Sequence, residues 1–209
     1  MNSSPATHRP PAPRPRRGRP GYDLESLLAV AARLFNERGY DGTSMEDLSR
    51  KLGITKSAIY HHVPSKEELL RLAVGRALDA LFAQADQLDE VDGRAIDRLE
   101  HLVRGSVVVL AGQLPFVTLL LRVRGNTKVE REALARRREF DHLVADLVAT
   151  AAAEGDLRSD IDPAVTARLL FGMVNSLIEW YRPRGAAAAD ELASTVVAVA
   201  FDGLRVRPS

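Results

Sequence analysis

The sequence of 209 residues contains no cysteine, so it can form neither a disulfide framework nor a cysteine-ligated zinc site. It also lacks the run of about 18 apolar residues that a membrane-spanning helix requires, and its N-terminus has no apolar signal-peptide core. These absences lead us to expect a soluble, cytoplasmic protein. A hydrophobic content of 45% is enough for one helical domain, or for a small module joined to a larger one.

The first 22 residues lack acidic side chains altogether. They hold five arginines, so the rest of the chain carries a formal charge of about −4 although the whole chain carries +1. Repeated prolines prevent a helix, and the segment has too little apolar surface to fold, so we expect residues 1–22 to form a disordered basic tail. Two roles stay open for this tail: arginine contacts in a DNA minor groove, or non-specific attraction by a solvated leader.

From Asp23 onward, apolar residues recur at intervals of three and four, which indicates amphipathic helices. The first predicted helix begins after Asp23 and ends at Gly39. A capping box of Thr43 and Glu46 is expected to open a short second helix that ends near Leu52. No strand signal persists, so the expected fold is all-α. The later periodic segments predict helices at 66–87, 95–112, 115–124, 129–153, 163–182 and 188–204.

A glycine-bearing turn separates the second predicted helix from a short third one. Gly53 permits the turn, Thr55 can cap the third helix, and Pro64 ends it. Ser65 then opens a longer helix through a second capping box with Glu68. Two short helices joined in this way, braced by a helix on each side, form a helix-turn-helix unit. The side chains expected to fix the angle between the short helices are Leu48, Leu52, Ile54 and Ile59.

The stretch TSMEDLSRKLGITKSAIYHHVPSKEELL, residues 43–70, resembles the DNA-binding region of TetR-family transcriptional repressors. The resemblance is detailed over residues 23–75 and implies a DNA-binding domain at 23–68, linked by a long helix to an effector-binding and dimerisation domain at 69–209. In a helix-turn-helix the second helix enters the major groove, where its N-terminal residues meet base edges. Helix N-termini nearby can bind phosphates. The expected DNA-contacting residues are Thr43, Ser44, Thr55, Lys56, Ser57, Tyr60, His61, His62 and Lys66.

The adjacent histidines His61 and His62 are the first candidates for metal or catalytic chemistry. Adjacent helical residues point about 100° apart, so the two rings cannot readily hold one ion, unlike an i, i+4 pair. No Ser/His/Asp order, glycine-rich phosphate loop or paired carboxylate accompanies them. We therefore expect no metal, no cofactor and no enzymatic activity. We interpret the pair as donors to the DNA backbone, with His61 making the more direct contact.

The family resemblance also implies a dimer interface in the C-terminal part. The apolar stripes of PAVTARLLFGMVNSLIEWYRP and ADELASTVVAVAFDGL suit a four-helix interface between two copies. Such a homodimer would place two reading helices about one DNA turn apart on a palindromic operator. Ordinary core packing within one subunit is the alternative for the same stripes. The residues assigned to the interface are Leu170, Val174, Leu177, Tyr181, Leu192, Val196, Val199, Ala200 and Gly203.

The resemblance implies an effector cavity as well. The segment LPFVTLLLRVRGNT is apolar until its arginines, and a second arginine cluster, 136–138, lies beside Phe140. Apolar walls with a few cationic groups favour a lipophilic anion, either a carboxylate or an acyl-CoA thioester. A solvated arginine face over an ordinary aromatic core is the alternative. The residues assigned to the cavity are Phe116, Leu120, Arg122, Arg124, Phe140, Phe171, Met173, Asn175 and Trp180.

The sequence thus predicts a ligand-responsive, homodimeric repressor that a small-molecule effector releases from double-stranded DNA. The rival interpretations are a helical-bundle enzyme that binds acyl-CoA and an adaptor whose helix-turn-helix is idle. The enzyme would lack a nucleophile–base pair, and the adaptor would show no salt-dependent, sequence-selective DNA binding. Activation instead of repression also stays open, because it depends on operator position.

Overall fold

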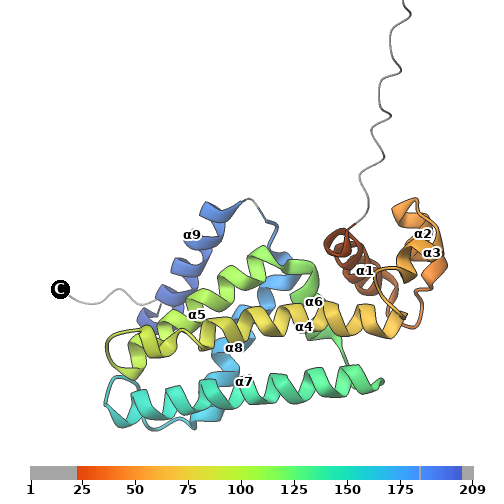
Figure 1. The fold of residues 1–209 in the computed structure, drawn as a ribbon. Helices are drawn as coiled ribbons and strands as arrows, with labels where there is room; N and C mark the ends of the chain where they lie inside the picture. Colours follow the sequence, from red (N-terminus) through yellow and green to blue (C-terminus); the bar gives the residue numbers. More distant parts are fainter. Residues whose placement is uncertain (1–22, 184, 204–209) are drawn as a thin grey trace, which may run out of the picture.

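The structure, a computed structural model, describes residues 23–183 and 185–203. Within those ranges the chain forms helices and no strand, which confirms the all-α prediction (Figure 1). The predicted disordered tail lies outside the described residues. A short 3₁₀ helix that the sequence did not suggest, η1 (Leu88–Glu90), follows the fourth helix, and a π-helical turn, η2 (Ala198–Asp202), follows the last. The α-helices are α1 (Leu24–Arg38), α2 (Met45–Leu52), α3 (Lys56–Tyr60), α4 (Lys66–Ala85), α5 (Ala95–Gly112), α6 (Leu114–Arg122), α7 (Lys128–Ala153), α8 (Pro163–Trp180) and α9 (Ala186–Val197).

Polar caps and glycines set the ends of the N-terminal helices. The side-chain oxygens of Asp23, Thr55 and Ser65 each accept the backbone N–H three residues further on, at 2.8–3.2 Å. Gly39 and Gly53 have positive φ angles and end α1 and α2. These starts and stops agree with the predicted ones, because each depends on a local hydrogen bond or backbone conformation that the residue type favours.

The capping box of α2 lies one residue later than predicted. Thr43 and Glu46 do not form it; instead Ser44 Oγ accepts the Asp47 N–H at 3.1 Å, and the Asp47 carboxylate accepts the Ser44 N–H at 3.0 Å. At α4 only half of the second predicted box forms, because the acid three residues after the cap bonds to Arg71 instead. In both cases the predicted capping side chain has another partner: the Thr43 hydroxyl donates to the Gly39 carbonyl, and the Glu68 carboxylate accepts from Arg71.

Buried apolar contacts fix the angle between α2 and α3. Leu48, Leu52 and Ile59 are buried as predicted, and Ile54 in the turn is half-buried beside them. The apolar side of α1 packs against α2 and is buried along its length. The packing leaves the polar side of α3 on the outside of the molecule.

The long helix α4 connects the two parts of the molecule. In Figure 1, α1–α3 lie together at one end, and α4 runs from them along the larger bundle, with α5 on one side and α7 on the other. It packs against α1, α5, α6 and α7, and one continuous buried core extends through both parts. The domain boundary predicted at residue 68 lies within the first turn of α4, so a movement of this helix acts on both parts.

α5 and α6 meet at a sharp corner beside Gln113, where their axes differ by 104°. Pro115 lies in the first turn of α6, where its missing N–H is tolerated. Among the described residues no single helix is long and apolar enough to cross a membrane, although this bent pair passes by length and composition together. The residues from Phe116 to Leu120 are buried, so the corner places an apolar wall inside the bundle.

Candidate DNA-binding surface and effector cavity

The N-terminal end of α3 presents three polar side chains to the outside. Thr55, Lys56 and Ser57 are all exposed at the end of the helix that meets base edges in a helix-turn-helix. The Thr55 oxygen accepts the cap hydrogen bond, which leaves the hydroxyl hydrogen available to donate. Three further predicted DNA contacts at the other end of α3 are also exposed: Tyr60, His61 and His62.

Lys56 forms an ion pair with Glu46 of α2. Both side chains are about half exposed, so water screens the pair and it contributes little to stability, about 0–1 kcal/mol. A base or phosphate could therefore exchange for Glu46 at small cost. The pair holds the Lys56 ammonium near α2.

Ser44 is exposed at the start of α2, and its hydroxyl is already committed locally. It accepts the Asp47 N–H and donates to the Asp47 carboxylate at 2.6 Å. These hydrogen bonds from Ser44, and to a smaller extent the charges of Arg50 and Arg38, lower the pKa of Asp47 below its usual value. A phosphate contact at Ser44 would have to replace the bond to Asp47.

Thr43 does not present its side chain to DNA, contrary to the prediction. It is 1% exposed, and its hydroxyl donates to the Gly39 carbonyl at 2.8 Å, with Leu34 O further away at 3.4 Å. This hydrogen bond satisfies a backbone acceptor just beyond the end of α1. Thr43 therefore supports the turn between α1 and α2.

Lys66, at the start of α4, holds the same turn from the other side. Its Nζ donates to the carbonyls of Tyr40 and Thr43 at 2.9 and 3.0 Å and lies 4.1 Å from the centre of the Tyr40 ring. An ammonium has three donors, so one remains for a phosphate oxygen. The predicted DNA contact at Lys66 is thus compatible with a structural role, in which it fastens the helix-turn-helix to α4.

The two adjacent histidines lie apart from any cluster of ligands. Among the described residues, no group of three or more His, Cys, Asp or Glu side chains could hold a metal ion. His62 lies near enough to Asp23 to contribute to lowering its pKa, although hydrogen bonds from Ser26 have the larger effect. His62 is therefore close to the start of α1 as well as to the end of α3.

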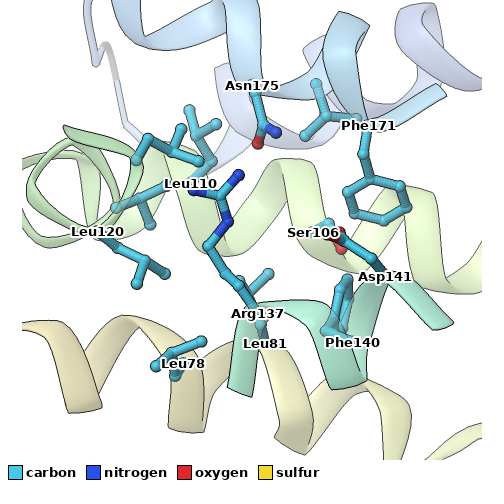
Figure 2. Close-up of a pocket in the computed structure, with 13 residues that line it drawn as sticks. Leu78, Leu81, Ser106, Leu110, Leu120, Arg137, Phe140, Asp141, Phe171 and Asn175 are labelled. Atoms are coloured by element: carbon cyan, nitrogen blue, oxygen red, sulfur yellow. The ribbon is translucent and has the colours of Figure 1, made fainter. Parts of the chain in front are cut away.

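A small, mainly apolar cavity lies among five helices of the larger part (Figure 2). Its volume of about 30 Å³ has room for one or two water molecules. α4, α5, α6, α7 and α8 all contribute to its walls. The lining residues are Leu78, Leu81, Ser106, Leu110, Val117, Leu120, Leu121, Arg137, Phe140, Asp141, Phe171, Val174 and Asn175.

The structure brings four of the predicted effector residues, Leu120, Phe140, Phe171 and Asn175, into this cavity. The other five do not line the cavity, because their side chains have other contacts or lie elsewhere on the surface. Phe116 lies under the Arg76 guanidinium, 4.6 Å from its ring centre, and Arg122 turns to the Asn36 carbonyl of α1 at 3.2 Å. Arg124 is exposed in the loop after α6, Met173 is partly buried, and Trp180 is exposed.

Four polar side chains line the apolar cavity: Ser106, Arg137, Asp141 and Asn175. Asn175 was assigned to the cavity from sequence and Arg137 was named there only within the cluster 136–138, whereas Ser106 and Asp141 were missed. Figure 2 shows the Arg137 side chain reaching into the pocket with its guanidinium toward the Asn175 amide. Ser106 of α5 is 1% exposed, and its hydroxyl has no hydrogen-bond partner among the described residues. A usable signal did exist for Arg137, because it lies four residues after Ala133 and three before Phe140, on the buried stripe of α7.

A second cleft of about 180 Å³ adjoins the cavity between α7 and α8. Phe171 and Asp141 line both spaces. The outer cleft also has three basic side chains at its rim, Arg138, His142 and Arg168. An apolar interior next to a cationic rim suits a ligand with a lipophilic body and an anionic end.

Aromatic contacts connect the cavity wall to α4. The rings of Phe140 and Phe171 pack edge to face with centres 5.4 Å apart, and Phe140 packs in the same manner on Phe82 of α4 at 5.7 Å. Arg136 stacks over Phe82 and pairs with Asp79 of α4 at 2.9 Å. A displacement of the wall at Phe140 would therefore press on α4.

α6 connects the cavity to the DNA-binding part by a second route. Asn36 of α1 donates to the Pro115 carbonyl at 2.8 Å. Arg76 of α4 bonds to Gln113 at 3.3 Å and forms an ion pair with Glu25 of α1. Since α6 also lines the cavity through Leu120, a shift of this helix would reach α1.

The apolar stripe predicted as the α8 dimer face is instead the buried one. Val174, Leu177 and Tyr181 are at most 8% exposed within a single subunit, which favours the alternative of core packing for these residues. The free apolar side chains on α8 are Val165, Leu169 and Trp180, with Leu169 66% and Trp180 58% exposed. Of the remaining assigned residues, Val196 is buried, Gly203 is exposed, and four are half-buried: Leu170, Leu192, Val199 and Ala200.

Two family models match the chain in the order of its two parts. A model of bacterial regulatory proteins, tetR family, matches residues 27–73, and a model of the tetracyclin repressor-like C-terminal domain matches residues 92–204. The first covers the helix-turn-helix and the start of α4. The second covers α5 to α9, which contribute most of the cavity.

Individual relatives match nearly the whole chain. The HTH-type transcriptional repressor KstR2 of Rhodococcus jostii (strain RHA1) is 31% identical over 192 residues, 90% of this chain and 93% of the relative. The crystal structure of SCO3833, a TetR regulator from Streptomyces coelicolor A3, is 57% identical with a TM-score of 0.82 over 88% of this chain and 92% of that one. AibR, solved in complex with isovaleryl coenzyme A and operator DNA, is 26% identical with a TM-score of 0.70 over 85% and 97%.

Proposed function

The chain belongs to the TetR family of bacterial transcriptional regulators, and from this premise we propose that it is a homodimeric repressor which a lipophilic anionic effector releases from a palindromic operator. Like its relatives named above, it is a ligand-responsive, DNA-binding regulator and not an enzyme. One observation carries the proposal: an exposed reading helix is joined through α4 to a small, mainly apolar cavity lined by Arg137, which has no ion-pair partner among the described residues. We place the protein in the cytoplasm, together with its operator.

In this proposal α3 reads the operator through its first turn. Lys56 exchanges Glu46 for the acceptors of a guanine edge, and the hydroxyls of Thr55 and Ser57 bond to neighbouring base edges. Tyr60 and His61, a turn later, contact the sugar-phosphate backbone. Additional backbone contacts come from His62, Ser44 and the third donor of Lys66.

We propose that two copies associate through the exposed side of α8. Val165, Leu169 and Trp180 lie on this side and form the large apolar surface that α8 does not bury in its own subunit. Exposed residues of this size on one helix face are typical of an interaction surface. The half-buried residues Leu192 of α9 and Val199 and Ala200 of η2 would extend the interface, which gives the four-helix arrangement expected for the dimer.

The effector is proposed to be an acyl-CoA or a lipophilic carboxylate. Its apolar body would enter the cavity beside Phe140 and Phe171, and the phosphates of an acyl-CoA would meet Arg138 and Arg168 at the rim of the outer cleft. The likeness to AibR, whose complex contains isovaleryl coenzyme A, supports the acyl-CoA alternative.

The small size of the cavity supports a mechanism for release from DNA. About 30 Å³ cannot hold an acyl chain, so the walls must separate when a ligand enters. The Phe82–Phe140–Phe171 contacts would then move α4, and α6 would shift α1 through Asn36. The two reading helices lose their matched spacing only if the effector binds this open conformation more tightly than the closed one.

The experiment that tests the proposal is a gel shift with DNA flanking the protein's own gene, repeated with a panel of acyl-CoAs and lipophilic acids. We expect sequence-selective binding that one class of compound abolishes. Binding that does not distinguish the flanking DNA from unrelated DNA would contradict the proposed repressor. Specific binding that no compound reverses would contradict only the proposed effector class.

A further inference from the structure

We infer that the effector inserts a carboxylate into the cavity, where Arg137 binds it with help from Asn175 and Ser106. This inference rests on the proposed function and specifies which end of the effector enters. A plain hydrocarbon tail would need only apolar walls, and those do not explain a guanidinium, an amide and a hydroxyl on the lining of one cavity. A carboxylate oxygen can accept from a guanidinium, an amide and a hydroxyl together.

The Arg137 guanidinium has no anionic partner in the structure. No hydrogen bond or ion pair engages it within residues 23–183 and 185–203, whereas its neighbour Arg136 is held by Asp79. Asp141, one turn further along α7, lines the same cavity but does not come within ion-pair distance. A half-buried cation among apolar walls is costly when unpaired, so a ligand anion placed here gains a strong contact.

The second observation is the buried hydroxyl of Ser106. Serine within a helix commonly bonds back to a carbonyl of the preceding turn, but Ser106 Oγ has no hydrogen-bond partner in the part of the chain that the structure describes. Buried polar atoms in native proteins are rarely left without one. Asn175 of α8 lies toward the Arg137 guanidinium, so polar side chains from α5, α7 and α8 line the same cavity (Figure 2).

The position of these groups gives the ligand its orientation. Arg137 reaches the interior of the bundle, while Arg138, the next residue, lies at the rim of the outer cleft. Adjacent helical residues point about 100° apart, which lets one helix serve both sites. A free lipophilic acid would use Arg137 alone, and a CoA monothioester of a dicarboxylic acid would use Arg137 for its far carboxylate and Arg138 for its phosphates.

The test is ligand binding to the full chain by calorimetry, with decanoate, methyl decanoate, decanoyl-CoA and the CoA monothioester of decanedioic acid as probes. Arg137→Met should weaken binding of the two carboxylates about 10- to 100-fold, which is the loss expected for a charge-assisted contact, and Arg137→Lys should restore part of it. Arg137→Met should change the affinity for methyl decanoate and for decanoyl-CoA by less than about 3-fold. Arg138→Met is the matched variant, and it should weaken the CoA compounds but not decanoate.

The result distinguishes a free acid from a CoA thioester as the source of the carboxylate. It also distinguishes a failure of the carboxylate site from a failure of the proposed repressor function. Binding of decanoate alone points to a free acid, and binding of the dicarboxylic thioester points to a CoA compound. Equal effects of Arg137→Met on ester and acid, or no binding by either carboxylate, would overturn the inference. Operator affinity without ligand is measured for each protein, so a failure of specific DNA binding, which contradicts the proposed function, is recorded separately.

Discussion

Replacement of Thr43 by valine separates the two roles that its position allows, support of the fold and contact with DNA. The Thr43 hydroxyl is buried and donates to the Gly39 carbonyl at 2.8 Å. Valine keeps the shape of the side chain but leaves that carbonyl without this donor. Loss of one partner of a buried hydrogen bond costs about 1–3 kcal/mol. In a chain of this length each kcal/mol lowers Tm by about 2–4 °C.

The assay is thermal unfolding followed by circular dichroism, combined with operator affinity measured well below Tm. We expect Thr43→Val to lower Tm and to leave the affinity of the folded protein unchanged. Thr43→Ser is the control, because it retains the hydroxyl and loses only a methyl group. An unchanged Tm with operator binding weakened about 2- to 10-fold would refute the structural role and return Thr43 to the set of phosphate contacts.

Four further predictions concern the DNA-binding surface, the dimer, the α2 cap and the tail. Tyr60→Phe should weaken binding about equally on all DNA sequences, whereas Lys56→Ala should relax the preference at one base position; identical changes in preference, measured by competition with operator variants, would contradict this division. Leu169→Glu should convert the dimer to a folded monomer in sedimentation experiments, because the residue is 66% exposed in one subunit; a dimer that persists would locate the interface elsewhere. The pKa of Asp47 is lowered by hydrogen bonds from the N-cap serine, so the capping box stabilises the fold above about pH 4 and this contribution is lost as pH falls through the lowered pKa. In urea unfolding at several pH values, Asp47→Asn should be less stable than the parent at neutral pH and should approach it in acid. Deletion of residues 1–20 should weaken operator binding and flatten its salt dependence; an unchanged slope of log K against log salt would leave the tail without a DNA contact.

The helices and most of their ends could be predicted because local groups determine them. Asp23, Thr55 and Ser65 cap helices through bonds that span three residues. The error at α2 shows where local reasoning stops. Thr43 and Ser44 both carry a hydroxyl that could cap the helix. The Thr43 hydroxyl donates to the Gly39 carbonyl, so Ser44 is the residue that accepts the Asp47 N–H and caps α2.

The choice between core and interface could not be made from the pattern of α8 alone. The helix has two apolar sides, and the more continuous one, with Val174 and Leu177, was assigned to a partner subunit. In the structure that side faces the protein's own core, and the sparser side with Leu169 and Trp180 faces outward. The stronger stripe belongs to the core because the intrasubunit neighbours α5, α6 and α7 offer more apolar surface to cover it.

The arginines near the cavity illustrate the same limit for charged residues. The sequence pointed to Arg122, Arg124 and the cluster 136–138 without choosing among them, but Arg122 bonds to α1 and Arg124 lies in a loop. Arg137 lies on the buried stripe of α7 and points inward. Helical position was therefore the better guide than proximity to apolar residues in the sequence.

The small size of the cavity would also set how sharply the regulated genes respond to a ligand. If the open conformation is populated at about 1% before a ligand arrives, the apparent affinity of every ligand is about 100-fold weaker than its affinity for the open form. Traces of a metabolite would then leave transcription off, and only its accumulation would turn transcription on. Packing at residues such as Leu120, which touch neither DNA nor the charged part of a ligand, would then set the ligand concentration at which transcription begins. Relatives that carry smaller side chains there would be induced at lower concentrations of the same compound.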